Sequence, residues 1–151
     1  MSWSAKLSEL GIELPSVVKP VAAYVPAVQT GNLVYTAGQL PMVAGDMART
    51  GKVGGEVTPE QGKQLARICA LNALAAVDSL VGLDAIVRIV KVVGFVASAP
   101  GFGGQPGVIN GASILLGEVF GDAGAHARSA VGVSELPLNA PVEVELIVEV
   151  A

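Results

Sequence analysis

The last segment of the chain alternates strictly between aliphatic and mostly charged residues. Five aliphatic side chains fall at every second position of residues 142–150. The positions between them hold Glu143, Glu145, Ile147 and Glu149. Successive side chains of a strand point to opposite faces of a sheet, so this period of two predicts a strand with one buried face and one largely polar face.

Runs rich in β-branched residues predict four further strands. They cover residues 25–29, 33–37, 85–97 and 127–133. Such residues fit the pleated, half-buried surface of a sheet. Gly31 and Asn32, between the first two runs, favour a tight turn. The Gly-rich stretch 45–55 predicts one short strand or loop around Lys52 and Val53.

Three segments have the pattern of helices. In the longest, Thr58 can act as the N-cap, Pro59 suits the first turn, and Gln61 completes a capping box. Apolar residues then recur at helical spacing as far as Leu80, and Gly82 ends the helix. Two other helices are expected: residues 108–120, after a Gly- and Pro-rich loop at 100–107, and a short helix at 4–10.

The order of these elements predicts an α+β fold. Two amphipathic helices would pack on one face of a mostly antiparallel or mixed sheet. The other face of the sheet would then stay uncovered. Because that face also carries apolar side chains, the pattern predicts that copies of the chain associate.

The composition agrees with one folded domain. The chain has 151 residues, of which 52% are hydrophobic, which is enough for a core and excludes a disordered chain. With one Cys and one His, neither a disulfide framework nor a clustered Cys/His metal site is expected. We expect a single domain over residues 1–151, with residues 1–15 as an N-terminal extension.

Charge and hydropathy argue against nucleic acid and membranes as binding partners. Nine scattered Lys and Arg residues stand against thirteen Asp and Glu, giving a net charge of −4, whereas a nucleic-acid groove needs a basic stripe. Mean hydropathy is +0.61, but the longest apolar run, residues 85–99, contains two cations and is too short to cross a bilayer. Residues 1–14 lack the pattern of a signal peptide. We expect a cytoplasmic protein that binds neither nucleic acid nor membrane.

Arg128 is the most informative candidate for chemistry. It lies in a strand of otherwise small and apolar residues, where an unpaired guanidinium is costly, so it must find an anion. One partner is Glu143 or Glu145, if the two strands pair. The other is a substrate carboxylate, which a planar guanidinium binds at two points. The two glutamates are either solvated side chains of an edge strand or a general base beside Arg128.

Other candidates carry weaker signals. Cys69 falls on the apolar face of the long helix, as a core residue does. His126 has no carboxylate nearby in sequence and is expected to be a surface or loop-anchoring residue. Tyr24, in an extended and proline-flanked segment, is either a pocket wall or a packed aromatic residue. The loop at residues 101–104 resembles a phosphate-binding loop only in its glycines, because no helix with the Lys-Ser/Thr of that motif fits it, and no nucleophile or dinucleotide motif is present.

Two segments resemble the signatures of the YjgF/RidA family, whose members are also labelled L-PSP endoribonucleases or translation initiation inhibitors. The first, residues 24–41, holds Tyr, Ala-Val, Gly-Asn-Leu and Ala-Gly-Gln-Leu-Pro in that order. The second, residues 127–137, is Ala-Arg-Ser-Ala-Val-Gly-Val-Ser-Glu-Leu-Pro, and Val-Glu-Val-Glu follows it. Asn110 stands where the family has an Asn on a helix. The resemblance extends from residue 18 to residue 151.

This resemblance implies a fold like that of the monofunctional chorismate mutase, in which two helices back a β-sheet. It also implies a homotrimer whose three sheets close into a central barrel, with active sites in clefts between neighbouring subunits. Active members hydrolyse reactive enamine and imine intermediates, such as 2-aminoacrylate, to a 2-keto acid and ammonia. They need no cofactor.

By the same resemblance, Arg128 would hold the substrate carboxylate and Glu143 would position or activate the attacking water. Five further residues would line the cleft or contact the ligand: Tyr24, Ala37, Gly38, Asn110 and Ala130. An imine carbon is already electrophilic, so orientation and one polarised water can suffice for so sparse a site.

Some features depart from the family pattern and place the chain in a divergent subgroup. Ala130 stands where active members typically have Cys, Gly132 stands where a Glu is common, and loop 99–107 is longer. A second function therefore stays open: a non-catalytic trimer whose clefts recognise small carboxylate metabolites. A ribonuclease disagrees with the acidic charge and the few aromatic residues, and a chorismate mutase would need more cations than Arg128 alone.

Overall fold

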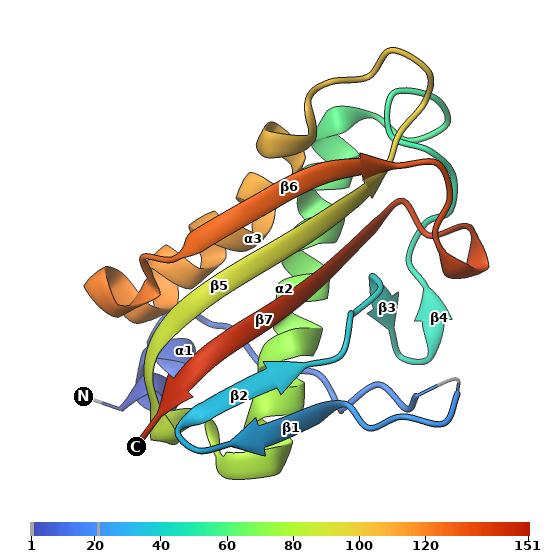
Figure 1. The fold of residues 1–151 in the computed structure, drawn as a ribbon. Coiled ribbons are helices and arrows are strands. Elements are labelled where there is room, and N and C mark those ends of the chain that lie inside the picture. Colours follow the sequence, from blue (N-terminus) through green and yellow to red (C-terminus); the bar gives the residue numbers. More distant parts are fainter. Residues whose placement is uncertain (1, 21) are drawn as a thin grey trace.

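A five-stranded sheet forms the centre of the fold in the computed structural model, which describes residues 2–20 and 22–151. Its strands lie in the order β1-β2-β7-β5-β6 (Figure 1). They are β1 (Ala27–Thr30), β2 (Leu33–Thr36), β5 (Ile86–Ala97), β6 (Ala127–Val133) and β7 (Val142–Val150). Strands β5 and β6 are parallel and the other neighbours are antiparallel. The predicted mixed sheet is therefore confirmed.

A small hairpin of β3 (Met42–Val43) and β4 (Asp46–Met47) was not expected from the sequence. Its two turn residues, Ala44 and Gly45, both have positive φ angles, of 52° and 88°. Two consecutive left-handed residues match the right-handed twist of a tight hairpin. Glycine adopts this conformation readily, whereas alanine does so rarely, so Ala44 gave no signal of a turn.

Three helices accompany the sheet in the described part of the chain. They are α1 (Trp3–Glu9), α2 (Pro59–Val81) and α3 (Gln105–Phe120), with short 3-10 turns at Leu83–Ala85, Gly121–Gly124 and Pro137–Asn139. The capping box of Thr58 and Gln61 is present as predicted. Helix α3 begins three residues earlier than expected, because Pro106 occupies its first turn, where a missing N–H breaks no helical hydrogen bond.

Helices α2 and α3 lie side by side on one face of the sheet (Figure 1). Alternate side chains of β7 point into the core between the sheet and the helices, as the alternation predicts. The two helices approach closely at Gly111, where a Cβ would overlap the backbone carbonyl of Lys63. Helix α2 is long and apolar enough to span a membrane by length and composition, but 56% of that stretch is buried inside the protein.

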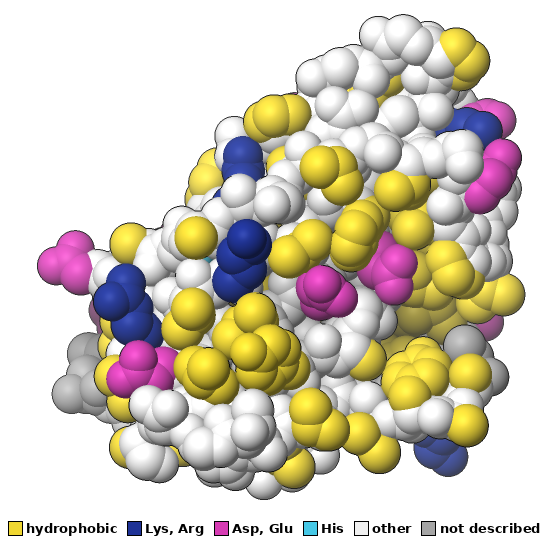
Figure 2. Space-filling model, viewed as in Figure 1, with side chains coloured by type: hydrophobic (Ala, Val, Ile, Leu, Met, Phe, Trp, Pro, Cys, Tyr) yellow, Lys and Arg dark blue, Asp and Glu magenta, His cyan; other side chains and the backbone are white. Residues whose placement is uncertain are grey.

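Among the described residues, no helix covers the other face of the sheet. Figure 2 shows this face, with hydrophobic side chains spread over the strands and a few charged groups among them. Its larger apolar side chains include Tyr35, Phe95, Val131 and Ile147, all of which are partly or fully exposed in the single chain. The predicted bare apolar face is thus confirmed, while its closure into a trimeric barrel stays a prediction.

The N-terminal extension folds onto the end of the domain. The Nε1 atom of Trp3 donates to the carbonyl of Ile86 at 2.8 Å, and its ring packs edge-on against Phe120 with 5.0 Å between ring centroids. Ser4 donates to the carboxylate of Asp84 from both its backbone and its hydroxyl. Helix α1 is therefore part of the packed domain, although a seven-residue helix is marginal in isolation.

Candidate active site

Four of the predicted site residues share one open cleft. The cleft has a volume of about 660 Å³, and its lining includes Tyr24, Ala37, Gly38 and Glu143. Strand β7 presents Glu143 on the uncovered face, beside the end of β2. A Cβ at position 38 would fall only 2.9 Å from the Cδ atom of Glu143. Gly38 therefore makes room for this carboxylate to lie against the backbone.

Glu143 has a perturbed acidity. Burial disfavours its ionised form and raises the pKa of its carboxyl group above the usual value, and the nearby charge of Glu145 raises this pKa further. The two carboxylates are neighbours because they lie two residues apart on the same face of β7. A carboxylate with a raised pKa, half-buried in a cleft, has the properties of a general base.

A second cluster surrounds Arg128 at the opposite edge of the sheet. Its Nη1 atom donates to Asn110 Oδ1 at 2.8 Å and to Ser113 Oγ at 3.2 Å, both on α3. Ala130 lies two residues further along β6, on the same helix-facing side, and packs against the core. Arg128 is half-buried and has no carboxylate partner among the described residues.

One of the two partners considered for Arg128 is therefore wrong. An ion pair with Glu143 or Glu145 required β6 to pair with β7, but β5 lies between them. Arg128 is in register with Val92 of β5, and Val92 with Leu146 of β7. Two strand spacings and three residues along the strand separate the Cα atoms of Arg128 and Glu143 by roughly 14 Å. Their side chains also point to opposite faces of the sheet.

Two polar neighbours of Arg128 were not predicted as site residues. Ser113 Oγ lies 2.8 Å from His126 Nε2, and His126 Nδ1 lies 2.6 Å from the carbonyl oxygen of Gly124. His126 is thus a loop-anchoring residue, as expected, but it also joins the group around Arg128. Sequence spacing could have indicated both: Ser113 follows Asn110 by three residues on one helix face, and His126 precedes Arg128 by two residues along the strand direction.

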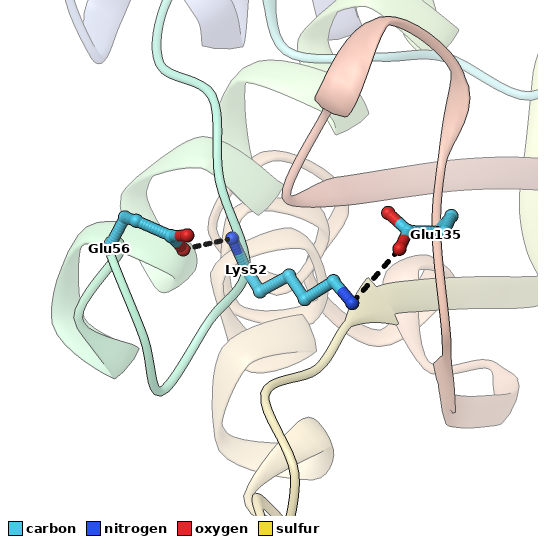
Figure 3. Close-up of polar contacts among 3 residues, drawn as sticks. All are labelled: Lys52, Glu56 and Glu135. Carbon is cyan, nitrogen blue, oxygen red and sulfur yellow. Dashed lines mark hydrogen bonds and ion pairs between the residues drawn. The ribbon is translucent and has the colours of Figure 1, made fainter.

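The loop between β6 and β7 is tied to the segment before α2. Lys52 Nζ lies 3.0 Å from a carboxylate oxygen of Glu135, and the Lys52 backbone N–H donates to Glu56 (Figure 3). The Gly51 N–H donates to the Asn139 carbonyl at 2.9 Å. Hydrogen bonding from the Lys52 backbone also lowers the pKa of the Glu56 carboxyl. These contacts hold Leu138 beside Tyr24 and Gly38, where all three line a smaller pocket of about 70 Å³.

The departures from the family pattern have a local structural consequence. A Cβ at Gly132 would fall 2.8 Å from the Nε2 atom of Gln105, the first residue of α3. That amide donates to Ser98 Oγ and to the Phe102 carbonyl. Because Gly132 has no side chain, Gln105 has room to make these hydrogen bonds, which hold the loop at residues 99–107 in place. No group of His, Cys, Asp and Glu that could hold a metal ion occurs in the described part of the chain.

Cys69 is a core residue, as expected. Its side chain is fully buried in α2, with Sγ 3.7 Å from the carbonyl oxygen of Val142. Burial raises the pKa of the Cys69 thiol well above its usual value, so the thiolate is disfavoured. It takes no part in either cluster.

Known proteins are similar over almost the whole chain. The family model described as endoribonuclease L-PSP matches residues 15–150. The protein TCP17 of Trypanosoma cruzi is 42% identical over 148 residues, which are 97% of this chain and 92% of that protein. A 2-iminobutanoate/2-iminopropanoate deaminase of Dermatophagoides farinae is 33% identical over 137 residues, 91% of this chain and 93% of that protein. A crystal structure of a protein of unknown function from Agrobacterium tumefaciens has a TM-score of 0.90 and 46% identity, covering 99% and 92% of the two chains.

Proposed function

Because the chain belongs to the endoribonuclease L-PSP family, also called the YjgF/RidA family, we propose that it is a hydrolytic deaminase of reactive enamine and imine intermediates. Its substrates would be small 2-imino acids of the 2-aminoacrylate type, and its products a 2-keto acid and ammonia. The observation that carries the proposal is Arg128, a half-buried guanidinium that two side chains of α3 orient and that no carboxylate of the described chain neutralises. Such a group is suited to bind the carboxylate of a ligand.

In this mechanism the enamine first tautomerises to the imine, and Arg128 binds the carboxylate. Glu143 accepts a proton from a water molecule while the water oxygen attacks the imine carbon. The imine nitrogen then takes this proton from Glu143, which yields a tetrahedral carbinolamine and returns Glu143 to its ionised form. In the collapse of this intermediate, Glu143 transfers the hydroxyl proton to the amine nitrogen, the C–N bond breaks, ammonia leaves, and the carbonyl of the 2-keto acid forms. One water is consumed for each ammonia released.

The mechanism requires two copies of the chain. Arg128 and Glu143 lie on opposite faces of one sheet, too far apart for a small 2-imino acid to contact both. We therefore propose a homotrimer in which the β6 edge of one subunit, with Arg128 and Ala130 on β6 and Asn110 on the adjoining α3, covers the Glu143 cleft of its neighbour. The exposed apolar face of the sheet supports this assembly, because it would become buried between subunits.

Complementation between two inactive chains tests the shared cleft. Arg128→Ala and Glu143→Gln chains, co-expressed with different affinity tags and purified through both, would form mixed trimers. About a third of the clefts in such trimers would combine an intact Arg128 with an intact Glu143, so about that share of wild-type activity should return. As a control, Arg128→Ala co-expressed with the doubly substituted chain should stay inactive. If the mixture of Arg128→Ala and Glu143→Gln chains is as inactive as this control, the two-copy site is contradicted.

A coupled assay tests the reaction itself. A threonine or serine dehydratase would generate the imine in the presence of semicarbazide, which traps it. Addition of this protein should divert imine to the 2-keto acid and lower the amount of trapped product. If the folded wild-type trimer diverts none, the deaminase proposal is wrong, and the alternative function as a carboxylate-binding protein would be tested by direct binding.

The raised pKa of Glu143 predicts the pH dependence of turnover. A general base must be ionised, so kcat/KM should fall as pH decreases through this pKa, and the fall should occur above the usual value of 4.5 for a Glu. Because the charge of Glu145 contributes to the shift, Glu145→Gln should move the acid limb of the profile to lower pH. The pH profiles of the two proteins, measured in the coupled assay, check this. If the acid limb of the profile is at the same pH in Glu145→Gln, a group other than Glu143 determines it.

A further inference from the structure

We infer that Ser113 and His126 are positioning residues that orient Arg128 so that one free edge of its guanidinium faces the ligand carboxylate. The inference rests on the proposed role of Arg128 as the carboxylate-binding group. It extends that role to two side chains that do not themselves touch the ligand.

The direction of the first two hydrogen bonds follows from Gly124. Its carbonyl oxygen can only accept, and it lies 2.6 Å from His126 Nδ1, so Nδ1 carries a proton. In a neutral imidazole the other nitrogen is then an acceptor. Ser113 Oγ, 2.8 Å from His126 Nε2, therefore donates its proton to the ring. The lone pairs of Ser113 Oγ remain to accept from Arg128.

These contacts occupy both hydrogens of Arg128 Nη1. One goes to Asn110 Oδ1 at 2.8 Å and the other to Ser113 Oγ at 3.2 Å. Three N–H groups remain, one on Nε and two on Nη2; the Nε–H and one Nη2–H point in parallel from one edge, and that edge matches the two oxygens of a carboxylate. Neither Nε nor Nη2 has a hydrogen-bond partner among the described residues.

The fold gives this chain of hydrogen bonds a fixed support. Asn110 and Ser113 lie three residues apart, so one face of α3 carries both acceptors for Nη1. His126 immediately precedes β6 and is anchored to the 3-10 turn Gly121–Gly124 through the Gly124 carbonyl. With Asn110 alone, a single hydrogen bond would leave the plane of the guanidinium less constrained. With Ser113 directed by His126, the second hydrogen bond fixes it.

Binding of a carboxylate and of its neutral amide separates positioning from general structural support. The probes are 2-oxobutanoate and 2-oxobutanamide, and their dissociation constants would be measured by calorimetry at mildly alkaline pH. Ser113→Ala should weaken binding of the carboxylate about tenfold, the effect of one lost hydrogen bond to a charged group. Binding of the amide should change much less. Ser113→Thr, which keeps the hydroxyl, should restore most of the affinity.

Two substitutions at His126 distinguish the contributions of its Nδ1 and Nε2 hydrogen bonds. The amide of His126→Gln can accept from Ser113 in place of Nε2, whereas that of His126→Asn can replace only the Nδ1 contact with Gly124. Carboxylate affinity should therefore be retained in the Gln variant and weakened in the Asn variant. Equal weakening of acid and amide, or no weakening in Ser113→Ala and His126→Asn, would overturn the inference. If Ser113→Ala does not fold, His126→Asn tests the same contacts.

A second readout does not need a ligand. In ¹⁵N NMR of the Arg128 side chain, rotation of the Nη1 group should be slow in the wild type and about tenfold faster once one hydrogen bond is lost. Unchanged rotation in Ser113→Ala would also overturn the inference. Failure of the proposed function has a different signature: either the wild type does not bind 2-oxobutanoate, or Arg128→Ala binds it as well as the wild type. In those outcomes the carboxylate role of Arg128 is wrong, whatever the rotation shows.

Discussion

Replacing Arg128 with Ala is expected to lower kcat/KM for imine hydrolysis by about 10²- to 10³-fold, the effect of removing one partner of a hydrogen-bonded charge pair. The side chain is held by Asn110 and Ser113 and carries the positive charge of its cluster. Without it, the substrate carboxylate has no cation to bind and the imine carbon is no longer held near the attacking water. The coupled dehydratase assay measures this loss.

Two further variants make the result specific. Arg128→Lys keeps the charge but cannot bind a carboxylate at two points, so its activity should lie between those of the wild type and Arg128→Ala. Arg67 serves as the control cation: it lies on the surface of α2, 3.5 Å from Glu118, and Arg67→Ala should leave turnover unchanged. Full activity in a folded Arg128→Ala protein would rule out the proposed carboxylate-binding site.

The strongly patterned elements could be predicted from sequence to the residue. Strands β6 and β7 begin and end where the apolar patterns begin and end, and α2 begins at its capping box. These signals are local, since side-chain period and cap chemistry depend only on neighbours along the chain. The β3–β4 hairpin was missed because its turn depends on Ala44 adopting a positive φ angle, for which alanine carries no signal.

The candidate site was harder to predict because it depends on the order of strands in space. Alternation places Arg128 and Glu143 each on one face of its own strand, but it does not say which strands are neighbours. The insertion of β5 between β6 and β7 rules out the ion pair, one of the two partners considered for Arg128, and leaves two separate clusters. For Arg128 and Glu143 the pattern left a structural and a ligand-binding or catalytic role open, and only the family resemblance favoured the second. The resemblance alone supplied the roles of Ala37, Gly38, Asn110 and Ala130.

Glu143→Gln is expected to lower kcat by about 10²- to 10⁴-fold, the usual contribution of a general base. Glutamine has nearly the same shape and can still fill the space above Gly38, but it cannot accept a proton from water. In the proposed site Arg128 binds the carboxylate at the other side of the cleft, so the affinity for 2-oxobutanoate should stay within about threefold of wild type, a change of less than 1 kcal/mol. Loss of kcat with retained product binding would identify the residue as the base.

Glu149→Gln is the matched control. Glu149 lies on the same face of β7, but its neighbours in the strand register are Leu33 of β2 and Arg88 of β5, away from Gly38. This substitution changes the same charge on the same strand and should leave kcat unchanged. If Glu143→Gln keeps wild-type turnover, water activation does not depend on this carboxylate. If instead product binding falls together with kcat, Glu143 shapes the cleft, and the base must be sought among its other polar groups. Only a loss confined to kcat in Glu143→Gln, absent in Glu149→Gln, distinguishes proton transfer from a general effect of negative charge on this face of the sheet.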